Sequence, residues 1–400
     1  MNGREAPFMK KTELLQEVRK MRFEEAYKGW EKGRLTQTEA AMLLGVCDRT
    51  FRRYLLRYED KGMEGLIDQR LGQVSHRSAP VDEVVALTDL YNNRYRGFNA
   101  KHFYSWYLRA HSGTRSYTWV KKTLQSEGLV PKGYKKGTHR KQRPRAPYIG
   151  MMLHQDGSTH EWVPGKQWDL IVTMDDATSG HYSMFFVDEE GTQSSFQGIT
   201  EVIKAHGVFA SLYTDRGSHY WHTPEAGGKV DKDNLTQFGR AMKQLGIEMI
   251  PAYSPEARGR SERAFRTHQE RLVKELALAG ITEMSQANEY ISNVYMPAHN
   301  DEFAIAPEEP VGMFIPWIGA PIEDVLCEQH IRQVGNDNCV RFDGMVLQIP
   351  QDQHRYHYVK VKVRVHRYPN GNLAIFYGHR KLATYDSFGK EVLNTDRKAA

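Results

Sequence analysis

The sequence of 400 residues contains only three cysteines, Cys47, Cys327 and Cys339, and they lie far apart. This number and spacing support neither a disulfide framework nor a zinc site of grouped cysteines. No run of about eighteen apolar residues is present, so the sequence predicts no membrane span. The first residues, MNGREAPFMKKTELL, lack the apolar centre of a secretory signal. We therefore expect an intracellular, cytoplasmic protein.

Acidic residues are missing between Pro131 and Arg145, where PKGYKKGTHRKQRPR contains seven lysines and arginines. The net charge of the whole chain is only +6, so this block concentrates positive charge in one place. Such a block either contacts a polyanion or is a solvated tail. Its position between segments that are expected to fold favours nucleic acid. The DNA-binding candidates in it are Lys132, Lys135, Lys136, Arg140 and Lys141.

A capping box and an arginine-rich helix indicate a helix-turn-helix near the N-terminus. Thr36 and Glu39 have the spacing of a capping box, and Asp48 can cap a second helix, DRTFRRYLLRYEDKG. That helix is expected to bury Phe51 and Leu55. A plain helical hairpin with solvated arginines has a similar pattern, but turn, cap and charge together favour DNA binding. The residues expected to face DNA are Arg49, Thr50, Arg52, Arg53 and Arg57.

The same pattern recurs after a linker. Residues 81–94 and 99–111 have amphipathic helical spacing, and Ser116 can cap a third helix that buries Val120 and Leu124. We interpret this segment as a second helix-turn-helix, because tandem modules suit an extended duplex site. Its DNA-binding candidates are Tyr117, Lys121 and Lys122.

Alternating strands and helices are predicted from about residue 148. Three consecutive strands, expected to be antiparallel, are followed by a regular alternation of helix and strand, which describes a ribonuclease H-like α/β core. The predicted strands are 150–155, 167–175, 181–187, 208–214 and 248–251, with helices at 194–206, at 235–245 and from about 259.

Three carboxylates occupy special positions in this predicted core. Asp156 is expected to end the first strand, Asp215 to end the fourth, and Glu262 to open the helix after the turn at Ser254-Pro255. Sites in open α/β sheets form at strand ends. Hard oxygen ligands select Mg²⁺ or Mn²⁺ over zinc. The sequence therefore predicts a catalytic, metal-binding site of Asp156, Asp215 and Glu262, in which two ions per site clamp an in-line phosphoryl displacement.

Short β runs dominate after about residue 330. Alternation in VKVKVRVHRY puts valines on one face and lysines and arginines on the other, which is either an ordinary solvated face or a nucleic-acid surface. We expect a multidomain chain with an N-terminal all-α tandem helix-turn-helix region, a central α/β ribonuclease H-like core and a C-terminal small β-barrel or antiparallel sheet. The predicted domains are 1–72 and 78–130 (helix-turn-helix), 131–147 (basic linker), 148–284 (core), 285–329 (helical and irregular connector) and 330–390 (barrel).

Long motifs in the core carry a family resemblance. DGS, YTDRGSHY and SPEARGRSERAFRTHQERL resemble the DDE transposases of bacterial insertion sequences, in the retroviral-integrase superfamily. The stretch from Asp215 to Arg263 is most similar to the ISNCY type. GRSER stands where the superfamily has a G-x-x-E-R signature, which selects Glu262 over Glu256 and Glu270. The resemblance covers nearly the whole chain, and all three acidic positions are intact.

The resemblance implies a function that spacing alone does not give. Such enzymes bind the inverted repeats at the ends of their element, hydrolyse a phosphodiester to free a 3′-hydroxyl, and join that hydroxyl to target DNA without a covalent protein–DNA intermediate. The implied partners are terminal-repeat and target double-stranded DNA and a second protomer, as a homodimer or higher oligomer on DNA in which each active site acts on the end bound by its partner. No membrane is involved. The implied location is the bacterial cytoplasm, with nucleoid association when the protein is bound to DNA.

Residues around the three acids have open roles. Arg263 and Arg266 could hold DNA phosphate or pair with carboxylates, and Arg258 and Arg260, near the start of the helix, could also contact phosphate. His219 could touch the scissile phosphate or tune Asp215. Asp175 and Asp176 could add a ligand, or simply finish the second strand and start a turn.

Three rival functions fit the sequence less well. A nuclease that only hydrolyses does not need two sequence-reading modules. A non-enzymatic regulator that kept a transposase body predicts damaged acids, and these are intact. A zinc-dependent hydrolase lacks grouped histidine and cysteine ligands.

Overall fold

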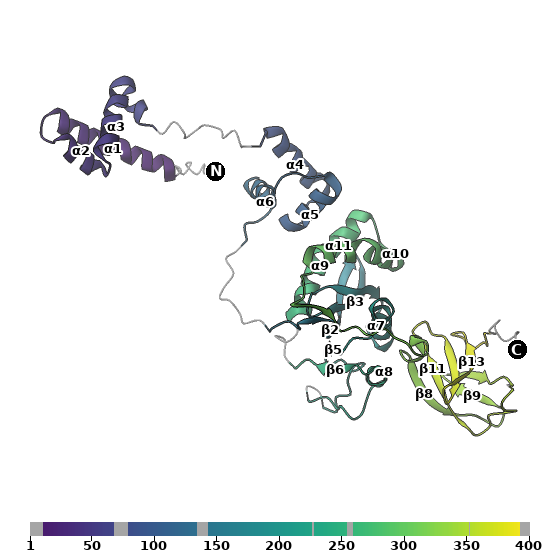
Figure 1. Cartoon of the computed structure of the whole chain (residues 1–400). Helices are drawn as coiled ribbons and strands as arrows, with labels where there is room; N and C mark the ends of the chain where they lie inside the picture. Colours follow the sequence, from purple (N-terminus) through teal and green to yellow (C-terminus); the bar gives the residue numbers. More distant parts are fainter. Residues whose placement is uncertain are drawn as a thin grey trace. The chain divides into compact units, whose positions relative to one another are not determined.

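The computed structural model describes residues 11–67, 79–133, 143–225, 228–253, 259–351 and 353–392. The chain forms two compact units, Met1–Asp89 and Leu90–Ala400 (Figure 1). In the part of the chain that is described, no helix has both the length and the apolar character needed to span a bilayer.

The first unit is helical. It contains α1 (Lys11–Glu31), α2 (Gln37–Leu44), α3 (Asp48–Lys61) and the short 3₁₀ helix η1 (Gly62–Leu66). The predicted capping box is present, because Thr36 and Glu39 cap the start of α2 reciprocally. Gly45 ends α2 in the left-handed conformation, with φ 68°, which glycine adopts without the steric cost of a Cβ.

The start of α3 differs from the expectation. Cys47, not Asp48, is the N-cap residue, and Asp48 is already the first helical residue. The side chain of Asp48 instead accepts a hydrogen bond from Thr38 Oγ1 at 2.9 Å, which ties α3 to α2. As predicted, Phe51 and Leu55 are buried, and they pack with Phe23 of α1.

Three further helices follow: α4 (Val81–Arg94), α5 (Ala100–His111) and α6 (Tyr117–Ser126). Asn99 caps α5 and Ser116 caps α6, each through its side-chain oxygen. Val120 and Leu124 are fully buried, as expected. The helices are therefore confirmed, whereas their identity as a second helix-turn-helix stays a prediction.

The second unit has a five-stranded mixed sheet at its centre (Figure 1). Its order is β4-β3-β2-β5-β6, in which β2, β3 and β4 are antiparallel and β5 and β6 run parallel to β2. This topology agrees with the predicted ribonuclease H-like core. The strands are β2 (Met152–Val163), β3 (Lys166–Asp175), β4 (His181–Val187), β5 (Ser211–Thr214) and β6 (Glu248–Pro251).

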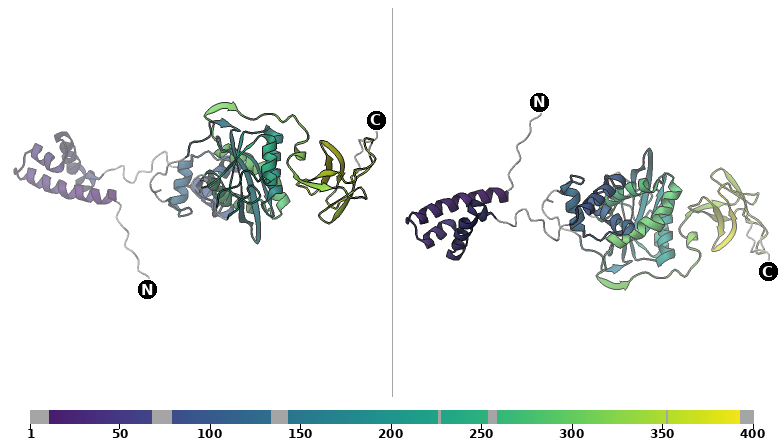
Figure 2. Two further views of the ribbon diagram at one scale, coloured as in Figure 1. Left: turned by 90° about the horizontal axis from the view of Figure 1, so that it is seen from below. Right: turned by 90° about the horizontal axis from the view of Figure 1, so that it is seen from above.

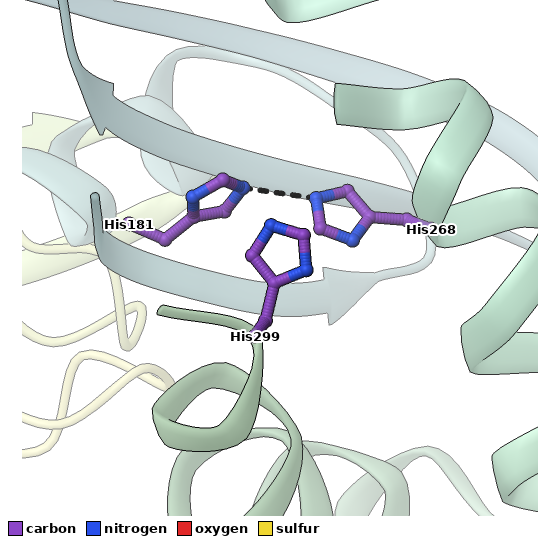
Figure 3. Close-up of side chains that lie close together, drawn as sticks. All are labelled: His181, His268 and His299. Carbon is purple, nitrogen blue, oxygen red and sulfur yellow. Dashed lines mark hydrogen bonds between the residues drawn. The ribbon is translucent and has the colours of Figure 1, made fainter. Parts of the chain in front are cut away.

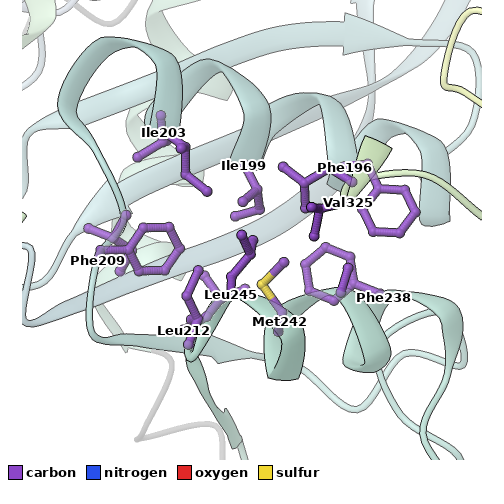
Figure 4. Packing of buried hydrophobic residues seen from close by; sticks show 14 of the residues in the cluster. Phe196, Ile199, Ile203, Phe209, Leu212, Phe238, Met242, Leu245 and Val325 are labelled. Carbon is purple, nitrogen blue, oxygen red and sulfur yellow. The ribbon is translucent and has the colours of Figure 1, made fainter. Parts of the chain in front are cut away.

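Helices cover both faces of this sheet (Figure 2). On one face lie α7 (Thr192–His206) and α8 (Gln237–Leu245), whose apolar side chains form the cluster in Figure 4. Phe196 of α7 stacks on Phe238 of α8 with ring centroids 5.5 Å apart, and Leu212 of β5 packs in the same cluster.

The other face carries the helices that follow β6. These are α9 (Gly259–Ala279), α10 (Met284–Tyr290), the π-helical turn η3 (Ile291–Tyr295) and α11 (Met296–Phe303). Phe265, Leu272 and Leu276 of α9 lie in one buried cluster with apolar side chains of β2, β3 and β4. Their spacing near seven and four residues is the one from which the sequence predicted a buried helix face.

Helix α5 is held on α9 and α11 by polar contacts. Nε2 of His102 lies 2.8 Å from Oε1 of the buried Glu275, and Ser105 donates to Glu302 at 2.6 Å. Burial tends to raise the pKa of Glu275, but the hydrogen bond and charge of His102 outweigh it and lower that pKa. The α5 region is thus packed on the same helix whose first turn carries Glu262.

The C-terminal region is β-rich, but it is not the predicted barrel. Residues 328–385 form a four-stranded antiparallel sheet, β13-β12-β11-β8, and a separate two-stranded sheet, β10-β9. Within the described ranges no pairing closes the two sheets into a barrel. The strands are β8 (Glu328–Gln333), β9 (Cys339–Phe342), β10 (Met345–Gln348), β11 (Lys362–Arg367), β12 (Leu373–Tyr377) and β13 (Arg380–Tyr385). The connector before them contains β7 (Glu309–Gly312), which pairs with β1 (Tyr148–Ile149), and the 3₁₀ turn η4 (Ile322–Asp324).

The predicted basic face of β11 is also only partly present. Val365 and His366 are adjacent and both buried, so the alternation ends before the strand does. Arg364 donates to the carbonyl oxygen of Gly378, and Arg367 pairs with Glu328 and Asp343. These contacts within the region use the guanidinium groups that the sequence left available for nucleic acid.

A buried carboxylate, Asp176, ties the sheet to the segments beside it. It accepts hydrogen bonds from Nη2 of Arg143 at 2.5 Å, from Nε2 of His154 at 2.7 Å and from the backbone N–H of Ala146 at 2.7 Å, and it pairs with Arg260 of α9. Burial alone raises the pKa of the Asp176 carboxyl. The bonds from His154 and Ala146 and the charges of His154 and Arg260 outweigh burial, so that its pKa lies well below the usual range.

We predict that Asp176→Asn destabilises the second unit. An asparagine keeps the shape but leaves the guanidinium groups without a counter-charge, and breaking a buried pair from one side costs about 3 kcal/mol of unfolding free energy. Urea denaturation followed by tryptophan fluorescence measures the difference. Asp188→Asn, an exposed substitution at the end of β4, is the matched control.

The pH dependence gives a second check on the same variant. A carboxyl whose folded pKa is lowered contributes stability that is full above its unfolded pKa, about 4, and is lost as the pH falls toward the folded pKa. The wild type should therefore lose its advantage over Asp176→Asn as the pH drops below about 4. An equal stability of the two proteins at neutral pH would contradict the role of Asp176.

Candidate active site on strands β2 and β5 and helix α9

Asp156 lies within β2 and not at its end. The strand was expected to finish at Gln155, but it continues to Val163 and pairs with β3 along its length, with Asp156 opposite Val172. The side chain is buried, with 7 % of its surface exposed, and Oδ1 accepts a hydrogen bond from the N–H of Gly157 at 3.1 Å. The first predicted site residue is therefore held on a rigid central strand.

Asp215 directly follows β5, as predicted. Strands β2 and β5 pair in parallel, and the last registered pair is His154 with Tyr213. Asp156 and Asp215 each lie two residues after this pair, so Asp215 comes level with Asp156, one residue past the end of β5. Neighbouring strands are about 4.8 Å apart, so this register brings the two aspartates to adjacent positions. Oδ1 of Asp215 also accepts a hydrogen bond from Gly217 N–H at 2.8 Å, which fixes the turn after the strand.

Glu262 lies in the first turn of α9 and its side chain is exposed. The preceding residue, Ser261, lines a small pocket together with Asp156 and Ala264. Further along the helix, Nε2 of Gln269 donates to Oγ of Ser158 at 3.0 Å. The start of α9 therefore packs on the part of β2 that carries Asp156. The predicted turn at 254–258 lies outside the described residues.

A fourth acid, Glu190, lies beside this site and was not among the residues predicted from the sequence. A Cβ added at Gly157 would meet Oε2 of Glu190 at 2.2 Å, so the carboxylate sits directly against the residue after Asp156. Oε1 of Glu190 is 3.5 Å from Nε2 of His219. The only signal in the sequence was an acidic run after a strand, a feature that ordinary turns share.

His219 and Tyr220 form the wall between these acids. A Cβ at Gly217 would lie 3.0 Å from both Oδ1 of Asp215 and a ring carbon of His219, so glycine permits the two side chains to approach. Burial raises the pKa of the Tyr220 hydroxyl well above its usual value, and the negative charges of Glu190, Asp156 and Asp215 raise it further. Three acids thus surround one buried phenol.

The three predicted carboxylates do not form a tight cluster. Among the described residues, their oxygens are not gathered within 4.8 Å of one another. Like charges repel at short range, so carboxylates that share a cation site come together fully only with the cation. Asp175 and Asp176 have no part in such a set, because hydrogen bonds to neighbouring groups occupy both of them. This agrees with the structural alternative for the two residues.

The predicted DNA-binding residues fall into three groups. On α3, Arg49, Arg52, Arg53 and Arg57 are exposed, whereas Thr50 is half-buried and its Oγ1 lies 3.2 Å from Sγ of Cys47. On α6, Tyr117 is half-buried and has the ammonium groups of Lys101 and Lys121 over its ring. The exposed remainder is Lys122, Lys132, Arg263 and Arg266.

Arg260 has a role other than the one predicted. Its guanidinium binds Asp176 and the carbonyl oxygen of Arg143, so it joins α9 to the end of the basic segment. Arg145 donates to the carbonyl oxygens of Asp176 and Ala177. The candidates Lys135, Lys136, Arg140, Lys141 and Arg258 lie outside the described residues.

Comparisons with known proteins agree with this arrangement. A family model described as a winged helix-turn-helix matches residues 26–79. Between residues 11 and 67 the described chain is helical and contains no β-wing.

Three solved viral structures are similar at low level. One is a simian T-cell lymphotropic virus intasome in complex with a PP2A regulatory subunit (TM-score 0.33, 14 % identity, 70 % of this chain and 92 % of that one). The others are trimeric and dimeric forms of the HTLV-2 integrase catalytic core domain in complex with magnesium (TM-scores 0.29 and 0.28, 15 % identity, 37 % of this chain and 88 % of each). At TM-scores this low, the structural similarity supports no conclusion about this chain.

Two curated relatives are more informative. The transposase for insertion sequence IS1202 of Streptococcus pneumoniae is 25 % identical over 307 residues, which are 68 % of this chain and 66 % of the relative. The putative transposase y4bF of Sinorhizobium fredii (strain NBRC 101917 / NGR234) is 30 % identical over 357 residues, which are 87 % of this chain and 76 % of the relative. Because the similarity to y4bF reaches 30 % identity over most of both chains, this chain belongs to the transposase family.

Proposed function

We propose that this protein is a DDE transposase that binds the terminal inverted repeats of an insertion sequence, frees their 3′ ends and joins them to target DNA. The register of β2 with β5 is the observation that carries the proposal. It supports a site at which Asp156 and Asp215 come level, two residues after the last registered pair. Ser261, the residue before Glu262, lines a small pocket with Asp156, which supports adding Glu262 to the same site. The order strand–Asp, strand–Asp, helix–Glu is the one that the family resemblance implies.

Asp156, Asp215 and Glu262 would hold two Mg²⁺ or Mn²⁺ ions. The donor set fits these ions, because it consists of carboxylate oxygens, which hard cations prefer. When bound, the ions polarise the phosphodiester and the attacking oxygen. The same three acids would serve cleavage and joining, because water or a 3′-hydroxyl attacks in turn and the leaving oxygen exchanges place with the nucleophile.

Glu190 and His219 would act as positioning residues in this site. His219 stands between Asp215 and Glu190, and Glu190 stands against Gly157, so the pair fills the side of the site away from α9. The Glu190 carboxylate would orient the imidazole, so that His219 could contact the scissile phosphate or hold Asp215 in place.

DNA binding would come from the exposed arginines of α3, from α6 and from the basic segment. Base edges would be read by α3 and α6, while lysines and arginines of the segment 131–147 would contact phosphates. Two element ends must be held together for joining, so we infer a homodimer or higher oligomer on DNA, with each active site acting on the end that the partner binds.

The first test compares wild type with Glu262→Gln on a labelled duplex that carries the terminal repeat, with Mg²⁺ and a second duplex as target. Glutamine keeps the shape of the side chain but removes the anionic ligand. We expect 3′-end nicking and joining to fall at least about a hundred-fold, while affinity for the duplex is retained.

The matched control is Glu270→Gln, an exposed acid two turns further along α9 whose carboxylate only accepts from Asn99. It should nick and join like the wild type. An equal loss of nicking and joining in both variants would contradict the assignment of Glu262 to the active site. Nicking without joining by the wild type would point to a hydrolytic nuclease, and binding without either reaction to a regulator.

The second test concerns the exposed arginines of α3. Arg52→Ala/Arg53→Ala should weaken binding to the terminal-repeat duplex, and the slope of log K against log salt should fall by about two if both side chains contact phosphate. Fluorescence anisotropy over a salt series measures both quantities. Arg19→Ala/Arg22→Ala removes the same charge from the exposed surface of α1. Equal effects of the two double variants would show that only net charge matters.

A further inference from the structure

Three buried histidines meet on the face of the sheet that α9 and α11 cover. His181 begins β4, His268 lies in α9 and His299 in α11, and 2 %, 0 % and 7 % of their surfaces are exposed. One potential ligand atom from each lies within 4.8 Å of the others. Figure 3 shows one ring nitrogen of each residue turned toward the centre of the group.

The hydrogen bonds around the cluster define its tautomers. Nδ1 of His181 lies 3.1 Å from the carbonyl oxygen of Ser179, an acceptor, so this nitrogen carries the proton and Nε2 has a free lone pair. Nε2 of His268 lies 2.9 Å from that lone pair and donates to it. Nδ1 of His268 then accepts from the hydroxyl of Tyr295 at 3.0 Å.

His299 is the member without a complete set of partners. Its Nδ1 is buried and has no hydrogen-bond partner. The centroid of its ring lies 4.5 Å from the ring centroid of His181 and 4.7 Å from that of His268. A purely structural hydrogen-bonded cluster gives no reason for a third imidazole here, because a buried polar atom without a partner costs stability.

The backbone around the cluster is held firmly. Oδ1 of Asn300 accepts from the N–H of His181 at 2.8 Å, and Nδ2 of Asn300 donates to the carbonyl oxygen of His181 at 2.9 Å. The residue next to His299 therefore fastens α11 to the first residue of β4. Pre-organised side chains of this kind are typical of ligand sites.

We propose that His181, His268 and His299 form a binding site for one divalent transition-metal ion, with zinc as the ion that the three imidazoles suit best. Zinc accepts three histidine ligands and leaves a fourth position for water. Ligand nitrogens at about 2.1 Å from zinc lie roughly 3.4 Å apart in a tetrahedral site. The His181–His268 pair would therefore open by a few tenths of an ångström.

Binding needs no net release of a proton. His268 changes tautomer, so that its proton moves from Nε2 to Nδ1. There the N–H donates a hydrogen bond to the hydroxyl oxygen of Tyr295, and Nε2 becomes a ligand. His181 keeps its bond to the Ser179 carbonyl, which is the arrangement that orients a metal-bound imidazole.

The charges that face the cluster are balanced. Arg271 of α9 opposes a cation, but Glu302 of α11 binds its guanidinium with both oxygens, at 2.8 and 2.9 Å. Glu275 and Glu302 also act on Tyr295, whose pKa burial raises first and these carboxylates raise further. Glu275 is itself paired with Arg109 at 3.8 Å, so two carboxylates stand against two guanidinium groups around the cluster.

The ion would fasten β4, α9 and α11 together, and it would differ in class from the ions of the carboxylate site. Nitrogen ligands favour zinc, whereas carboxylates favour magnesium. This site does not depend on the proposed transposition activity, because its ligands and its metal are separate from those of Asp156, Asp215 and Glu262.

The test uses the full chain, purified without a histidine tag, and measures its metal content by mass spectrometry and its thermal unfolding. We expect about one zinc per chain. Removal of zinc by EDTA should lower the unfolding midpoint by roughly 5 °C or more, and added Zn²⁺ should restore it. The Asp156→Asn/Asp215→Asn variant should bind the same single zinc, which separates this site from the carboxylates.

His299→Gln should abolish the zinc and the EDTA effect. The matched control is His366→Gln, because His366 is also buried, stacks on Phe376 and has no bond to either ring nitrogen, but stands alone. It should keep one zinc per chain. No zinc and no EDTA effect in the wild type, or zinc that persists in His299→Gln, would overturn the proposal; the wild-type measurement decides even if the variant does not fold.

Discussion

The core of this transposase depends on one buried carboxylate, Asp176. Its partners come from the segment before β1, from β2 and from α9, so a single side chain joins α9 to two neighbouring segments much earlier in the chain. A buried carboxylate is stable only when charges and N–H groups surround it, and here they do. Asp176 therefore holds the first turn of α9 through Arg260, and that turn also carries Glu262.

A second constraint is the register of the sheet. Parallel pairing of β2 with β5 cannot slip by one residue without turning every buried side chain of β5 to the opposite face. Leu212 is packed under α7 and α8, so the apolar core holds the register in place. Because this packing fixes the register, it also fixes the adjacent positions of Asp156 and Asp215. The candidate chemistry thus rests on an apolar cluster on one face of the sheet and on an ion pair at its end.

Local signals made much of this fold predictable. The capping box at Thr36, the bounds of β4 and the seven-residue spacing of Phe265 and Leu272 are all properties of short stretches, and the structure has them. The length of β2 was not predictable in the same way, because Gly157 and Ser158 read as a turn, whereas pairing with β3 carries the strand through them. Closure of a barrel depends on distant strands, so the C-terminal alternation could not decide it. Glu190 and the three histidines come together only through the tertiary fold.

The same reasoning explains why α9 matters twice. Its first turn is exposed and carries Glu262, while His268, less than two turns later, is fully buried among His181, His299 and Tyr295. Under the proposed function, the Glu262 side chain needs freedom to move toward a cation, whereas the helix that carries it must stay on the sheet. An exposed first turn on a helix with a firmly bonded middle meets both demands. The hydrogen bonds of His268 therefore hold the middle of α9 on the sheet, while the exposed first turn leaves the Glu262 side chain free to change its rotamer.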